Sequence, residues 1–141
     1  MASTWTPLGP GTMKIGTIPK DFSCEVVGAG VTHTYSDVGT ERTMLCGDVR
    51  GATSTRRDGF KASVENDLSA AGLYAFLQTN DLTDQELTFI PNTAGGAEWL
   101  GPVRVQLPSE IGATAYGEPI ASDIEWAAAS ADGKLTFTPA A

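Results

Sequence analysis

The chain has 141 residues, a mass of 14.7 kDa, 41% apolar and 18% charged residues, and a formal net charge of −8. This composition suits one domain with a real core, and it excludes a disordered tail or a charge-rich coiled coil. No apolar run approaches the roughly 18 residues of a membrane helix, and the N-terminus lacks the pattern of a signal peptide. We therefore expect a soluble intracellular domain without a membrane anchor.

The negative charge is concentrated in the second part of the chain. Residues 1–61 carry seven Lys/Arg and six Asp/Glu, a net +1, whereas residues 62–141 carry two Lys/Arg and eleven Asp/Glu, a net −9. Binding to phosphate backbones needs clustered cations, so this balance argues against a nucleic-acid-binding protein. Solubility alone would explain the acidity, and a surface that repels nucleic acid is the alternative interpretation.

The first twelve residues differ in character from the rest of the chain. Two prolines and two glycines surround Trp5 and Leu8, which predicts an extended N-terminal arm over residues 1–12. Residues 13–141 are predicted to form a single β-rich domain that opens with a strand at 13–17.

The next segment alternates apolar and polar residues. Phe22, Cys24 and Val26 alternate with Ser and Glu, which predicts a half-buried strand with Cys24 in the core. Glycines at 28 and 30 interrupt this pattern. Residues 31–35 alternate again, so the two segments are expected to pair as a hairpin.

Residues 37–59 are polar and rich in turn residues, which predicts a long functional loop. The loop holds the densest cations of the chain, namely Arg50, Arg56 and Arg57, and only the Met-Leu-Cys run at 44–46 interrupts its polarity. A strand is predicted after it, over residues 60–64.

One helix is predicted, over about residues 68–79. Its apolar positions recur at the helical period on one face, which is typical of a helix packed on a sheet. Asp67 or Ser69 is expected to cap its N-terminus, and Asn80 is expected to end it in the left-handed conformation.

Short strand patterns return after the helix, near residues 86–90, 103–107, 119–127 and 134–138. The total is about seven or eight short strands with one helix. The predicted fold class is mainly β, either a β-sandwich or a half-open barrel with a flanking helix.

Catalytic and metal-binding patterns are absent from the sequence. His33 is the sole histidine, and no activated nucleophile can be placed beside it. Cys24 and Cys46 are expected to be free thiols, and together with one histidine they are too few for a zinc site. The glycines at 28 and 30 do not complete a nucleotide-binding loop. We predict no enzymatic activity, no cofactor and no metal.

Seven short motifs follow one another through nearly the whole chain. They are MKIGT at 13–17, DFSCEV at 21–26, LCGD at 45–48, GLYAFL at 72–77, LTFIPN at 87–92, WLGPVRV at 99–105 and SDIEW at 122–126. In this order they resemble the tail tube (major tail) proteins of long-tailed, siphovirus-type bacteriophages, particularly those that infect actinobacteria. Many such proteins carry an additional C-terminal immunoglobulin-like domain, and we expect no surface-decoration role of that kind for the present sequence, which ends just after Pro139.

The resemblance implies a structural virion protein, made in the cytoplasm of the bacterial host. It implies hexameric rings that stack into a tube, with a tape measure protein, a tail terminator and distal tail or baseplate proteins as partners, and a lumen that conducts DNA during infection without binding it specifically. The alternatives are the tube of a contractile injection apparatus, a head–tail connector or a virion-surface binding module, since one scaffold serves several roles.

The assembly contacts expected on this basis are Trp5 and Leu8 in the arm and Arg50, Arg56 and Arg57 in the loop. Glu65 and Glu86, which alternate with core positions on their strands, are the candidates for an acidic lumen wall.

Overall fold

The computed structural model describes residues 6–16, 19–38, 42–51 and 53–140. Within these residues the chain is mainly β, with one 3-10 helix, η1 (Ser23–Glu25), and one α-helix, α1 (Leu73–Asn80). The strands are β1 (Thr12–Ile15), β2 (Lys20–Asp21), β3 (Val26–Val38), β4 (Arg42–Thr43), β5 (Val49–Arg50), β6 (Thr53–Glu65), β7 (Asp84–Ile90), β8 (Glu98–Arg104), β9 (Ile111–Gly112), β10 (Ala121–Ala128) and β11 (Thr136–Thr138).

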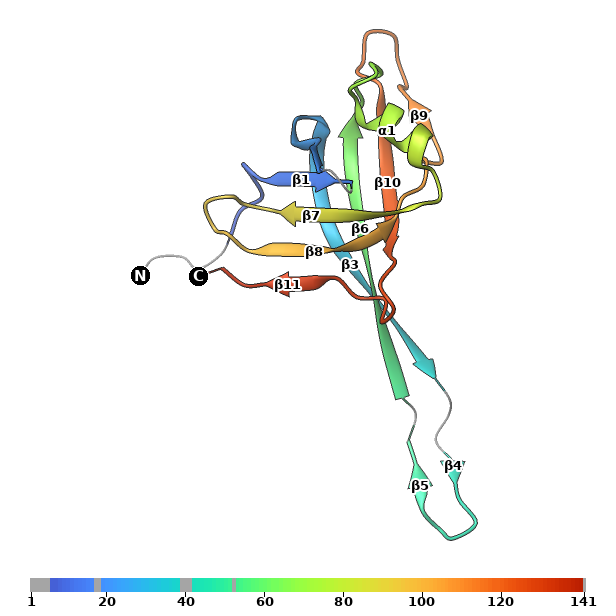
Figure 1. The fold of residues 1–141 in the computed structure, drawn as a ribbon. Coiled ribbons are helices and arrows are strands. Elements are labelled where there is room, and N and C mark those ends of the chain that lie inside the picture. Colours follow the sequence, from blue (N-terminus) through green and yellow to red (C-terminus); the bar gives the residue numbers. More distant parts are fainter. Residues whose placement is uncertain (1–5, 17–18, 39–41, 52, 141) are drawn as a thin grey trace.

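Nine of the strands form one antiparallel sheet that folds over itself. The strand order is β2-β1-β7-β8-β10-β6-β3, with β11 beside β8 and β9 beside β10. Strands β1, β7, β8 and β11 cross over β3, β6 and β10, and α1 lies at one end of the two layers (Figure 1). The predicted mainly-β class with one flanking helix is confirmed.

The core lies between these two layers because each strand turns alternate side chains inward. In β10 every second residue is buried, beginning with Ser122 and ending with Ala128. Phe60 of β6 is fully buried, and its ring centroid lies 5.2 Å from that of Phe89 in the opposite layer. Trp126 of β10 packs on the same ring and donates a hydrogen bond from Nε1 to the Gln106 carbonyl at 3.1 Å.

Helix α1 is shorter than predicted because its N-terminus is capped from another element. The carboxylate of Glu25 accepts the Leu73 N–H at 3.0 Å and the Asp67 N–H at 2.8 Å. The Asp67 side chain bonds instead to the Ser69 N–H, so neither expected cap is used. Asn80 is the last helical residue and is not left-handed; the positive φ falls on Leu82.

The strand predicted around Cys24 is wrong. These residues form η1, and Cys24 is exposed rather than buried. Strand β3 begins only at Val26, continues through both glycines, and pairs with β6 along its length, with a bulge between Val26 and Gly28. The side chain of Phe22 is buried. The alternating pattern therefore identified one core residue correctly, although the strand that it predicted does not form.

The segment predicted as a long loop is a β-hairpin. Strands β3 and β6 stay paired as far as Val38 and Thr53, and β4 and β5 pair beyond them. The hairpin extends well past the two-layer body (Figure 1). Its alternation was hidden in the sequence because both faces of its outer part carry polar side chains.

The predicted N-terminal arm is held against the body along its described part. The Gly9 N–H donates to the Pro91 carbonyl, and the buried side chain of Asn92 donates to the carbonyls of Pro7 and Gly9 at 3.1 and 3.2 Å. Residues 7–10 are therefore part of the fold, and Trp5 lies outside the described residues.

Candidate functional site

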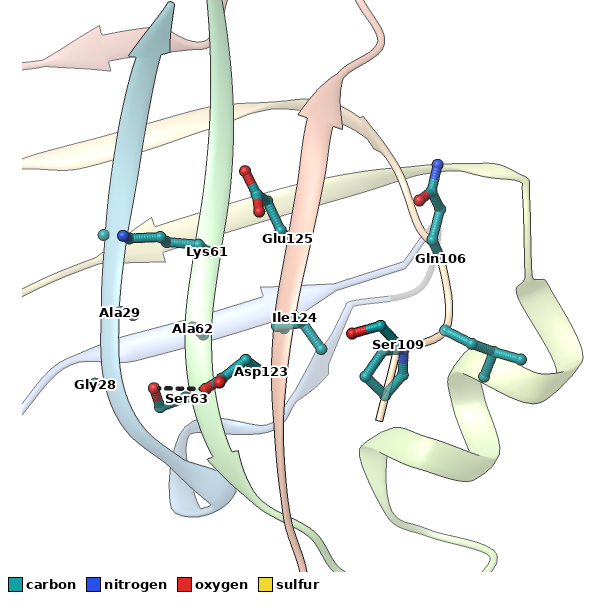
Figure 2. A pocket seen from close by; sticks show the side chains of 13 residues that line it. Gly28, Ala29, Lys61, Ala62, Ser63, Gln106, Ser109, Asp123, Ile124 and Glu125 are labelled. Atoms are coloured by element: carbon teal, nitrogen blue, oxygen red, sulfur yellow. Dashed lines mark hydrogen bonds between the residues drawn. The ribbon is translucent and has the colours of Figure 1, made fainter. Parts of the chain in front are cut away.

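The outer face of β3, β6 and β10 is a polar surface with a shallow hollow of about 820 Å³. Figure 2 shows Lys61, Ser63, Asp123 and Glu125 on this face, and Ser63 Oγ donates to Asp123 Oδ1 at 3.0 Å. The face combines small neutral residues with charged side chains of both signs. Such a surface is suited to contact with water and mobile ions more than to the binding of an apolar ligand.

Two glycines form one side of the hollow. A Cβ added to Gly28 or to Gly30 would have no atom within 4 Å. The surrounding fold therefore does not require glycine at either position, although glycine weakens a strand. Their effect is to keep this part of the face free of side chains.

Neither a metal-binding cluster nor a membrane-spanning helix occurs among the described residues. No group of three or more His, Cys, Asp or Glu in this part of the chain is placed to hold a metal ion. None of the described helices has the length and apolar character needed to cross a bilayer.

The two predicted lumen residues lie in different layers. Glu65 is exposed at the end of β6, in the layer whose outer face carries the hollow, whereas Glu86 is exposed on β7 in the opposite layer. The structure does not bring them together, because alternation on each strand identifies outward positions without identifying the layer.

The predicted contact arginines differ in their surroundings. Arg57 is exposed on β6, and Arg50 lies on β5. Arg56 is half-buried on the opposite face of β6, with its Nε 3.1 Å from the buried Asp58 Oδ1. The N–H of Arg56 does not point at this oxygen, so the contact is an ion pair without a hydrogen bond. Arg56 thus has a partner inside the chain.

Asp58 joins three elements where the hairpin leaves the body. Its Oδ1 lies 2.7 Å from Nδ1 of His33 on β3, and its Oδ2 accepts the Leu135 N–H at 2.9 Å. Burial alone would raise the pKa of Asp58. The hydrogen bonds from His33 and Leu135 and the charge of Arg56 outweigh burial and hold that pKa below its usual value. His33, the sole histidine of the sequence, therefore has a structural role as a hydrogen-bond partner of Asp58.

Two segments with exposed apolar side chains lie at opposite ends of the molecule, and Figure 1 shows the course of the chain there. We call residues 42–50 the tip, because they end the hairpin, and residues 65–72 with 110–120 the crown, because they lie at the far end of the body. The exposed apolar residues of the tip are Met44, Leu45 and Val49, and those of the crown are Leu68, Tyr116 and Ile120. In the sequence, only the Met-Leu-Cys interruption of the polar segment pointed to either surface.

Leu8, the other residue predicted as an assembly contact of the arm, is also exposed, at 56% of its surface. It lies beside the short connection that follows β7, because its neighbour Gly9 is bonded to Pro91. An apolar side chain fixed in this way is available to another molecule.

No protein-family model and no curated protein sequence matches the chain. Solved structures do match it, and two of them are described here, both with a TM-score above 0.5. One is a chain in the tail of an empty gene transfer agent particle refined with C6 symmetry, with a TM-score of 0.58 and 14% identity over 91% of this chain and 95% of that one.

The fold is that of a phage-type tail protein. The second match is a chain in the virion of a native gene transfer agent particle, with a TM-score of 0.56, 15% identity and the same coverage. At this level of identity the likeness establishes the fold of the tail protein and leaves its assembly to be argued from the chain itself.

Proposed function

We propose that this chain is a non-enzymatic tail tube subunit that forms six-membered rings, and that these rings stack into a tube in a virion. The observation that supports this most is the fold shared, over 91% of the chain, with a protein in a C6-symmetric tail. We further propose a long, siphovirus-type tail, with the tape measure, terminator and distal tail proteins as further partners.

Ring formation would satisfy the sheet edges that the isolated chain leaves open. Strand β3 is the last strand of the sheet order and has 13 residues, with Val27 and Tyr35 exposed along it. A long edge strand of this kind readily pairs with another chain. In a closed ring of identical subunits every such edge meets a neighbour, so that assembly ends at a fixed number.

The lumen in this proposal is lined by the outer face of β3, β6 and β10. Glu65, Asp123 and Glu125 give this face three carboxylates, against Lys61 and the more distant Arg57. Phosphates are repelled by such a wall, which would let DNA pass without being held. Glu86 lies in the other layer and is assigned to a different surface of the tube.

The proposed assembly contacts are Leu8 on the body and the cations of the hairpin. Among these cations, Arg57 is the best suited to a mutational test because its side chain is exposed. A substitution of Arg56 would also disturb its ion pair with Asp58. Single exposed ion pairs contribute only about 0–1 kcal/mol, and repetition around a ring multiplies that small contribution.

The lumen assignment predicts that the purified subunit has no measurable affinity for duplex DNA at physiological salt. The Asp123→Lys/Glu125→Lys variant, which adds two cations beside Lys61, should bind duplex with an affinity that falls steeply as salt rises. Fluorescence anisotropy with a labelled duplex measures both. Tight, salt-dependent binding by the unmodified subunit would favour a connector role instead.

A further inference from the structure

A row of aromatic rings runs outward from the core across three neighbouring strands. Phe89 on β7 pairs with Trp99 on β8, and Trp99 pairs with Phe137 on β11. Directly opposite residues of antiparallel strands share one face, so the three rings lie side by side. Their centroids are 6.0 Å and 4.8 Å apart. We call these three residues, together with the buried Phe60 beside Phe89, the aromatic row.

The aromatic row becomes more exposed toward its outer end. Phe60 and Phe89 are buried and Trp99 is half-buried, whereas Phe137 is 51% exposed. Within the described part of the sheet, β11 pairs with β8 alone, so no further strand continues the row. A phenylalanine in this position gains free energy when its remaining surface is covered.

The N-terminal segment enters the described structure next to the strands that carry this row. Asn92 Nδ2 donates to the Pro7 carbonyl at 3.1 Å. A Cβ built on Gly95 would stand 3.5 Å from the methyl group of Thr6, so Thr6 lies beside that glycine. Asn92 and Gly95 both belong to the connection between β7 and β8. Residue 5 therefore starts within one residue's reach of this connection, about 3.3–3.6 Å.

The composition of residues 1–5 suits them to an apolar surface. Their one aromatic side chain is that of Trp5, and they contain no Lys, Arg, Asp or Glu. They can therefore cover an apolar surface without removing a charged side chain from water. A tryptophan placed against a phenylalanine also gains from the preferred geometry of aromatic pairs, beyond the area that it buries.

From these observations we propose that residues 1–5 dock on the outer end of the aromatic row of their own chain, with the Trp5 indole packed on the exposed side of Phe137. The contact extends the row by one ring. It assigns Trp5 to the folded subunit rather than to a neighbouring copy, whereas Leu8 stays exposed for assembly. The proposal does not rest on the tube function, because all of its contacts lie within one chain.

A double-mutant cycle on the unassembled subunit, followed by urea denaturation, tests this docking. Trp5→Ala should raise the equilibrium constant for unfolding about fivefold in the parent chain, and less than about twofold in a Phe137→Ala background. Leu100→Ala is the control background, because Leu100 is 41% exposed and follows Trp99 directly on β8, so its side chain lies on the opposite face. In that background Trp5→Ala should keep its full effect.

Nuclear Overhauser contacts give a direct readout, since the subunit has a mass of only 14.7 kDa. The indole protons of Trp5 should show contacts to the ring protons of Phe137, and these contacts should persist on dilution. A Trp5→Ala effect that is absent from the parent, or equally large in the Phe137→Ala background, would overturn the docking. Contacts that disappear on dilution would also overturn it, because they would come from a second copy. None of these results bears on the tube function, which assembly tests separately.

Discussion

Replacing Asp58 with alanine should lower the free energy of unfolding by about 1–3 kcal/mol at pH 7. The change leaves Arg56 without its ion-pair partner and the Leu135 N–H without its acceptor, at a position where Asp58 is only 4% exposed. Urea denaturation of the unassembled subunit measures the effect. Asp84→Ala is the matched control, since Asp84 pairs with Arg104 at the surface and should contribute only about 0–1 kcal/mol.

The effect of Asp58→Ala on the free energy of unfolding should depend on pH. The pKa of Asp58 is lower in the folded chain than its unfolded value of about 3.9, so its contribution to stability is complete above that value. The contribution is lost as the pH falls through the folded-state pKa. The stability difference between the unmodified chain and Asp58→Ala should therefore narrow below about pH 4. A difference that stays constant down to pH 2 would show that the carboxylate charge is not what stabilises this junction.

Replacing Phe60 with alanine should cost about 3–5 kcal/mol and loosen the packing of the two layers. Phe60 has no exposed surface, and its ring contacts Phe89 in one layer and Trp126 in its own. Leu100→Ala is the control, because Leu100 is 41% exposed on β8. Denaturant titration followed by tryptophan fluorescence reports both. A Phe60→Ala chain as stable as the control would contradict a core shared by the two layers.

Much of the fold could be predicted from periodicity. Alternation at residues 87–89 and 120–126 corresponds to β7 and β10, because one face of each strand is buried and the other is in water. The helical period of the apolar residues was sufficient to predict α1. Its start could not be found, since the cap comes from Glu25, 48 residues earlier in the chain, and local capping rules do not reach that far.

The site could be predicted less well, for a physical reason. Strand alternation separates outward from inward positions, which placed Glu65 and Glu86 at the surface, but the layer to which each strand belongs depends on long-range pairing. The sequence predicts a loop at Arg56 and Arg57, whereas both lie on β6, where strand geometry sends their side chains to opposite faces. Arg57 is therefore exposed, whereas Arg56 is half-buried beside Asp58.

Negative-stain electron microscopy of the purified chain at increasing concentration, with and without a tail initiator complex, tests the tube function most directly. A tail tube subunit should give rings with six-fold symmetry, and stacks of such rings with an open lumen. A chain that remains a dispersed monomer at the highest concentration, in both the presence and the absence of the initiator, would contradict the account.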